Sequence, residues 1–168
     1  MDATGGSRYG RGMELWELVA REQIRDTIAR YNHAGDSGRF DEMVEQFHPD
    51  GVLELVDSGE RHAGRDALRG FFTGVAARFA ASLEPRAPRG PLRHCVTNIR
   101  IIVDNPRAAH SDAYFLVITA IGLDHWGRYR DRFTPHEGRW LLEHRSVRTD
   151  GYADASTFSP GRLEPPPG

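Results

Sequence analysis

The sequence predicts an α+β domain in which three helices come first and pack on a curved, mostly antiparallel sheet. Three observations support this class. Apolar residues recur at helical spacing in three segments before residue 80, strand-like segments separated by turn residues follow from residue 93 onward, and a proline-rich run separates the two halves. A sheet that bends around helices leaves a conical pocket, which is where a ligand would bind.

The three helices are predicted from their apolar stripes. The first carries Tyr31 on its buried face and has a stop signal at Gly35. The second is short and ends at residues 48–51, and the third follows an entry at residues 64–66. The stripes are Leu18, Ile24, Ile28 and Tyr31; Phe40, Met43, Val44 and Phe47; and Leu68, Phe71, Phe72, Val75 and Phe79.

The strands are predicted from β-prone segments bounded by turn residues. One strand covers residues 52–57 and is followed by a turn at 58–60. A surface loop is expected at residues 84–91, where three prolines interrupt the chain. Four consecutive strands then follow, at residues 93–104, 110–123, 125–134 and 139–148.

The composition of the chain indicates one domain with a tail at each end. We expect a flexible glycine-rich tail at residues 1–13, a single domain at 14–152 and a flexible proline-rich tail at 153–168. No apolar run approaches the roughly 20 residues that a membrane helix needs, and residues 1–12 contain no hydrophobic segment typical of a signal peptide. These features predict a cytoplasmic protein with no membrane partner.

Several function classes lack support in the sequence. The net charge of -2 gives no basic footprint for nucleic acid, and the absence of lysine removes Schiff-base chemistry and a P-loop. The single cysteine, Cys95, rules out a disulfide framework or a multi-thiolate metal site. No metal-binding histidine pair at helical spacing occurs, so seven histidines are interpreted as surface residues: His33, His48, His62, His110, His125, His136 and His144.

The order of these elements and their motifs resembles the SnoaL-like branch of the nuclear transport factor 2-like superfamily, which includes scytalone dehydratase and bile acid dehydratase. The resemblance covers roughly residues 14–152 and rests on segments 28–36, 47–51, 64–68, 93–98, 127–131 and 140–145. It implies a cone-shaped α+β barrel that forms a homodimer or homotrimer and uses neither a metal nor an organic cofactor.

Three residues are candidates for catalysis. Tyr31 lies on a buried stripe, where it is either a core tyrosine or a donor to a bound ligand. Asp36 lies among glycines, where an aspartate is often a turn former or a cap. His94 shares the less apolar face of its strand, which by simple alternation would face solvent. The resemblance instead implies a pocket in which Tyr31 binds a substrate oxygen and Asp36 orients His94 as the general base.

Four further residues are candidates for substrate binding. The resemblance places an arginine at the position of Arg145, which either binds an anionic group or forms a structural ion pair. Tyr129 is expected inside the cone, on the strand face that also carries Asp131. Asn98 shares the strand face of His94, and Glu54 is either a pocket carboxylate or an exposed residue.

These residues predict a cofactor-independent dehydratase that acts on a small hydrophobic substrate, a hydroxylated carbonyl compound that we expect to be cyclic. His94 would remove a proton next to the carbonyl, and Tyr31 would stabilise the enolate oxygen. Two alternatives stay open: an isomerase or polyketide cyclase that uses the same pocket, and a non-catalytic ligand-binding protein or a scaffold like the β subunit of ring-hydroxylating dioxygenases.

Overall fold

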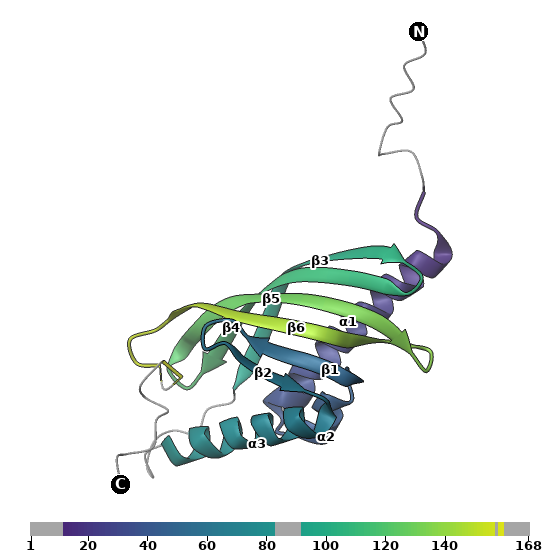
Figure 1. Ribbon diagram of the computed structural model, residues 1–168. Helices are drawn as coiled ribbons and strands as arrows, with labels where there is room; N and C mark the ends of the chain where they lie inside the picture. The colour runs from purple at the N-terminus through teal and green to yellow at the C-terminus, as the bar shows by residue number, and fades with distance from the viewer. Residues whose placement is uncertain (1–11, 83–91, 157, 160–168) are drawn as a thin grey trace.

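The computed structural model describes residues 12–82, 92–156 and 158–159, and it confirms the α+β class. Figure 1 shows a strongly curved sheet with the helices on its concave side. The helices are α1 (Leu15–Asp36), α2 (Phe40–Val44) and α3 (Arg65–Ser82). The strands are β1 (Phe47–Leu55), β2 (Glu60–Ala63), β3 (Arg93–Asn105), β4 (Ala108–Thr119), β5 (Gly122–His136) and β6 (Arg139–Tyr152).

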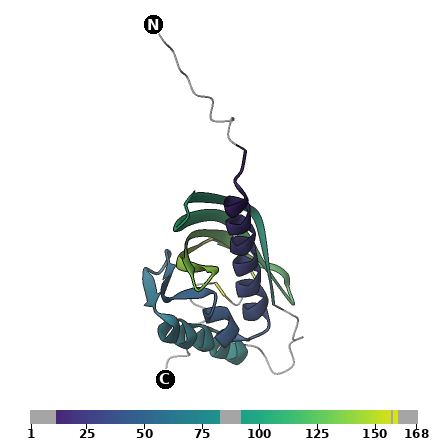
Figure 2. The ribbon, with the colours of Figure 1, turned by 90° about the vertical axis from the view of Figure 1, so that its right-hand side faces the viewer.

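The six strands have the order β2-β1-β6-β5-β4-β3. All neighbouring pairs are antiparallel except β1 and β6, which are parallel. In Figure 2 the sheet is seen wrapping around α1, with α3 below it. This arrangement encloses a core between the concave face of the sheet and the apolar stripes of the helices, with Ile24, Phe47 and Leu68 fully buried in it.

The boundaries of the early elements differ from the prediction at two places. The second helix ends at Val44, and Phe47 is the first residue of β1 and not part of that helix. The side chain of Phe47 is nevertheless fully buried, as its place in the apolar stripe predicted. The strand β2 was not predicted, because its four residues are mainly exposed and carry no apolar alternation. The proline-containing loop expected at residues 84–91 lies outside the described residues.

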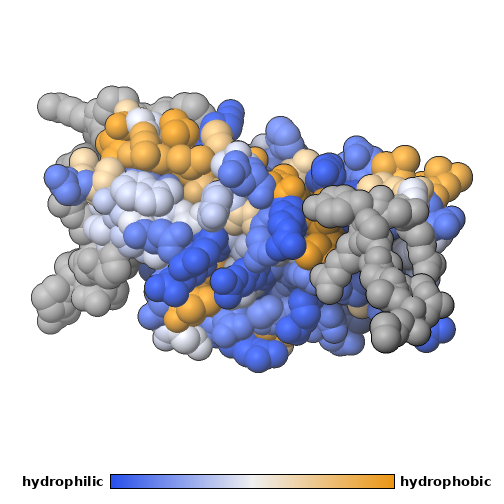
Figure 3. Space-filling view, turned by 90° about the horizontal axis from the view of Figure 1, so that it is seen from above, coloured by the Kyte–Doolittle hydropathy of each residue, from blue (hydrophilic) through white to orange (hydrophobic). Residues whose placement is uncertain are grey.

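The convex face of the sheet is largely hydrophilic, as Figure 3 shows, with hydrophobic groups gathered towards its ends. Ion pairs cross its strands: Arg130 and Arg100 flank Asp112 at 3.7 and 3.9 Å. Charged side chains therefore occupy one face of the sheet, and the concave face is left for the core and for a pocket.

A β-bulge at Asn98 changes which residues of β3 face inward. The pairing of β3 with β4 shifts between Thr97 and Arg100, and Asn98 has a positive φ of 53°. Before the bulge the even-numbered Val96 packs on the core, and after it the odd-numbered Ile101 is buried there. The bulge thus lets His94 and Ile101 lie on the same side of one strand, which uninterrupted alternation forbids.

Candidate active site

A cavity of about 470 Å³ lies between the concave face of the sheet and the helices α1 and α3. Its walls are mainly apolar and aromatic, with Phe72 and Phe79 from α3 and Phe115 from β4 among them. Few polar groups reach it, and they include the side chains of Tyr31, His94, His125 and Tyr129. A cavity of this size and character is typical of a site for a small organic molecule.

Asp36 and His94 form a hydrogen-bonded pair at this cavity. The Nδ1 atom of His94 lies 2.6 Å from Oδ1 of Asp36, and the backbone N–H of His94 donates to both carboxylate oxygens at 3.1 Å. Asp36 is the last residue of α1 and His94 the second residue of β3, so the contact also joins these two elements. Because a carboxylate only accepts hydrogen bonds, His94 carries its proton on Nδ1 and keeps Nε2 as the basic nitrogen.

Tyr31 and Tyr129 both contact the buried guanidinium of Arg145 with their rings. The Cζ atom of Arg145 is 4.2 Å from the centre of each ring, and Arg145 is 0% exposed. Its Nε and Nη2 atoms donate to the carboxylate of Asp131 at 2.9 and 2.7 Å in a bidentate pair. The strand register makes this pairing direct, since Asp131 of β5 is opposite Arg145 of β6.

The charges of this cluster set the acidity of the two phenols. Burial raises the pKa of Tyr31, whereas the neighbouring Arg145 guanidinium lowers it in part. Burial also raises the pKa of Tyr129, and the nearby Tyr31 raises it further. Burial alone would lower the pKa of Arg145, but the ion pair with Asp131 outweighs it and raises the pKa overall. Both phenols are therefore neutral O–H donors beside a permanent positive charge.

The structure corrects two of the predicted substrate-binding residues. Glu54 points to the convex face, because its neighbours Leu53 and Leu55 line the cavity, and its Oε2 atom lies 2.9 Å from Nε2 of His144. Asn98 is exposed at the bulge and is absent from the cavity wall. Its side chain accepts a hydrogen bond from Thr97 Oγ1 at 2.8 Å.

Of the two roles predicted for Arg145, binding of an anionic group and a structural ion pair, the structure supports the ion pair. Arg145 pairs with Asp131 rather than with Asp36 or Glu54, and it contacts the two tyrosine rings but does not line the cavity. Its Nη1 atom has no hydrogen-bond partner among the described residues. Arg145 therefore acts on the pocket through Tyr31 and Tyr129, not as a free cation.

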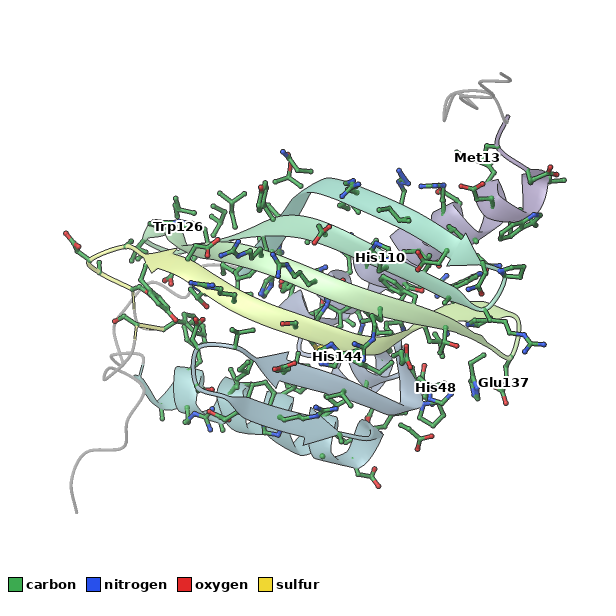
Figure 4. All side chains as sticks on the ribbon, turned by 45° about the horizontal axis from the view of Figure 1, so that its top comes forward. Met13, His48, His110, Trp126, Glu137 and His144 are labelled. Carbon is green, nitrogen blue, oxygen red and sulfur yellow. The ribbon has the colours of Figure 1, made fainter. Side chains whose placement is uncertain are left out.

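The prediction that seven histidines are surface residues is wrong for His125 and His144. His125 lines the cavity, and its side chain is only 13% exposed. His144 is largely buried beside Glu54. Figure 4 shows it on β6, with His110 on β4, in the same row across the sheet. His125 was missed because a strand start gives no sign of which face its side chain takes until the register with its neighbours is known.

No group of three histidine, cysteine, aspartate or glutamate side chains in the described part of the chain could hold a metal ion. Within those same residues, no helix has the length and apolar character needed to cross a membrane. The titratable side chains that line the cavity include imidazoles and phenols, together with the carboxylate of Glu60 and the guanidinium of Arg78.

The family model for the SnoaL-like domain matches residues 16–146. This chain belongs to the SnoaL-like family. No curated protein matches the sequence.

Solved structures similar to this SnoaL-like protein share its fold. A protein from Novosphingobium aromaticivorans named as a candidate scytalone dehydratase is 20% identical, with 84% of this chain and 91% of that chain covered and a TM-score of 0.69. A nuclear transport factor 2-like protein with a cystatin-like fold, from the same organism, is 22% identical, with 86% and 96% covered and a TM-score of 0.67.

A third structure contains a ligand. It is a protein from Catenulispora acidiphila in complex with S-DNPA, and it is 27% identical to this SnoaL-like protein, with 79% of this chain and 95% of that chain covered and a TM-score of 0.65. Together with the family match, these structures place the protein in a fold that is used by enzymes and by other proteins.

Proposed function

We propose that this SnoaL-like protein is a cofactor-independent dehydratase that acts on a hydrophobic, cyclic hydroxylated carbonyl compound. The observation that carries the proposal is the Asp36–His94 pair, with its 2.6 Å contact at an apolar cavity that also contains the Tyr31 phenol. The name of the Novosphingobium structure agrees with this activity, and the geometry supplies the independent support.

In the proposed reaction, Nε2 of His94 removes the proton next to the substrate carbonyl. Asp36 stabilises the imidazolium that forms, because its carboxylate accepts the Nδ1 hydrogen. The O–H group of Tyr31 donates to the enolate oxygen, and the adjacent Arg145 guanidinium favours the negative charge that develops there. Protonated His94 then gives its proton to the departing hydroxyl, which leaves as water, and the imidazole is restored.

An isomerase or a cyclase would use the same first step. Each requires proton removal by His94 and an enolate held by Tyr31, and the reactions differ only in the fate of that enolate. Product mass separates them, because only dehydration removes one water from the substrate. A scaffold role receives less support, since assembly through the outer face of the sheet does not require a hydrogen-bonded Asp–His pair at an apolar cavity.

The experiment uses 3-hydroxy-1-tetralone, a bicyclic β-hydroxy ketone that becomes 1-naphthol when it loses water. We expect the wild-type protein to accelerate naphthol formation, and His94→Ala and Asp36→Asn to lose at least about 100-fold in turnover, as is typical when a general base is removed. Both variants should still bind 1-naphthol. Turnover at the wild-type rate in both variants would contradict the mechanism.

His110→Phe is the matched control for this experiment. His110 also pairs with an aspartate, with 2.9 Å between its Nδ1 atom and Oδ2 of Asp104, but its side chain is 43% exposed and it does not line the cavity. We expect this variant to keep wild-type turnover. The pair of results then ties activity to the His–Asp pair at the cavity and not to histidine in general.

A further inference from the structure

A second imidazole projects into the cavity from the same row of the sheet as His94. Val117 of β4 is the direct partner of His94 on one side and of His125 on the other. Residues directly opposite one another in neighbouring strands point to the same face, so both imidazoles lie on the concave side. One intervening strand separates them, which places their Cα atoms about 10 Å apart.

His125 is held by its own carboxylate. Its Nδ1 atom lies 2.9 Å from Oδ1 of Asp124, which is 2% exposed. Asp124 also accepts hydrogen bonds from Thr119 Oγ1 at 3.1 Å and from Ser156 Oγ at 2.5 Å. A carboxylate in this position requires the His125 proton on Nδ1, so Nε2 of the neutral ring is a hydrogen-bond acceptor.

The surroundings of His125 are mainly aromatic and favour its neutral form. Its ring centre lies 6.1 Å from that of Phe115, 5.8 Å from that of Tyr152 and 4.9 Å from that of Phe158. Burial lowers the pKa of His125, Asp124 opposes this, and the positive charge that His94 can carry adds to the lowering. A neutral acceptor among aromatic rings binds a hydroxyl more strongly than it would in water.

We propose that His125 binds a hydroxyl group of the substrate by accepting its hydrogen at Nε2, at a point one strand away from the carbon on which His94 acts. The proposal rests on the pocket of the proposed function and narrows its substrate class. The substrate is then a flat cyclic compound whose hydroxyl donor lies across the ring system from the acidic C–H group.

The Ser156, His125 and Asp124 cluster does not form a serine nucleophile. Ser156 Oγ donates to Asp124, and the structure gives it no contact with the imidazole that would have to remove its proton. Ser156 and Thr119 instead fix the carboxylate, and the carboxylate fixes the ring. His125 is therefore positioned to bind a ligand group.

The experiment compares two fluorescent probes that differ in one hydrogen-bond donor. 7-Hydroxycoumarin offers an O–H group, and 7-methoxycoumarin keeps the oxygen but lacks the donor. We expect the wild-type protein to bind the hydroxy compound about three to ten times more tightly, as one neutral hydrogen bond allows. His125→Phe, which keeps the ring volume, should lose this preference, and His125→Gln should recover part of it because the amide oxygen accepts.

Two controls make the outcome specific to His125. His110→Phe should keep the full preference, because this histidine lies outside the cavity. His94→Phe should keep most of it, which assigns the hydroxyl to His125 and not to its neighbour. Nitrogen NMR of the wild-type histidines gives a measurement without any substitution, in which the hydroxy compound should shift the His125 Nε2 signal more than the methoxy compound does.

The proposal is overturned if the wild-type protein binds the two probes alike or binds neither, or if His125→Phe keeps the full preference. Coumarin binding requires no reaction, so this outcome is independent of turnover. If the protein dehydrates the tetralone but binds the two coumarins with equal affinity, only the His125 proposal is wrong. If the protein binds the hydroxycoumarin more tightly than the methoxycoumarin but does not dehydrate the tetralone, only the proposed function is wrong.

Discussion

At the scale of single residues, the pocket gains its chemistry from an ion pair that lies beside two phenols. Arg145 is fully buried, and a lone guanidinium there would be costly without the carboxylate of Asp131. The pair has no net charge, and its cation lies 4.2 Å from the centre of each tyrosine ring. The result is a polarised Tyr31 hydroxyl without an exposed cation that would attract water.

This arrangement makes a prediction for Tyr31→Phe. If the hydroxyl stabilises an enolate, its removal should lower kcat by about 100-fold to 1000-fold, as for a lost oxyanion-hole donor, and leave binding of 1-naphthol almost unchanged. Steady-state assays with the tetralone and a titration with naphthol measure the two effects.

Tyr129→Phe is the matched variant, because its ring centre lies at the same 4.2 Å from Cζ of Arg145. We expect its effect on kcat to stay below about tenfold, with the larger change in KM, since Tyr129 is proposed to contact substrate and not the developing charge. Equal losses of kcat in the two variants would remove the special role given to Tyr31.

At the scale of elements, the bulge in β3 determines the site. His94 faces the cavity only because Asn98 takes a left-handed conformation that switches the inward face from even-numbered to odd-numbered positions. A β-branched residue resists this conformation, whereas glycine accepts it readily. The side chain of Asn98 is exposed, so its backbone is what the site requires.

Substitutions at Asn98 therefore test a backbone role against substrate binding. Asn98→Val should lower the free energy of unfolding by about 1–2 kcal/mol, and Asn98→Gly should change it by less than about 0.5 kcal/mol. Denaturant unfolding measures both values. Glu137, with a φ of 50° in the turn after β5, is the control position, where the same two substitutions should give the same order of effects.

Binding supplies the other half of this test. If Asn98 shapes the backbone alone, Asn98→Gly should bind 1-naphthol as the wild type does. A weakened affinity in a fully folded Asn98→Gly protein would restore Asn98 to substrate binding, in spite of its exposed position.

The helices and the hairpins were predictable because their signals are local. The stripe from Ile24 to Tyr31 acts within two turns of helix, and α1 buries these residues as expected. The pairing of Asp36 with His94 followed from the family resemblance, since nothing local links residues 58 positions apart. Composition alone would have left Asp36 as a turn former.

The remaining features depend on register, which one sequence does not reveal. His125 reaches the cavity because β4 places Val117 between it and His94, and a shift by one residue would turn the ring outward. The register of β1 likewise decides that the side chain of Glu54 faces the convex side of the sheet. The bulge at Asn98 likewise leaves no mark in composition, because asparagine is common in turns and at the ends of strands alike.

At the scale of the whole molecule, His125 links the pocket to the segment that follows β6. Asp124 binds Ser156, and Phe158 stacks on Phe79 of α3 with 4.8 Å between ring centres. The described residues after β6 thus close one side of the cavity, within the segment that was expected to be a flexible tail. Protonation of His125 would therefore affect its contacts with this segment as well as its contact with a ligand.

The link predicts a dependence of stability on pH. The pKa of His125 is lowered in the folded protein, so between that value and about 6.5 the unfolded chain binds more protons than the folded one. Stability from this group is complete above about pH 6.5 and is lost as pH falls through the lowered pKa. One such group contributes a slope of at most about 1.4 kcal/mol per pH unit.

Denaturant unfolding of the wild type and of His125→Phe over a pH series measures this contribution as a difference between the two proteins. The groups that face His125 are Asp124 on its own strand, His94 across the cavity and Tyr152 of β6. Carboxylates elsewhere titrate in both proteins and cancel, so the wild type should lose more stability on acidification than the variant. His110→Phe should follow the wild type. If the curves of wild type and His125→Phe stay parallel below pH 6.5, His125 titrates as it would in water, and the closed aromatic environment assigned to it is wrong.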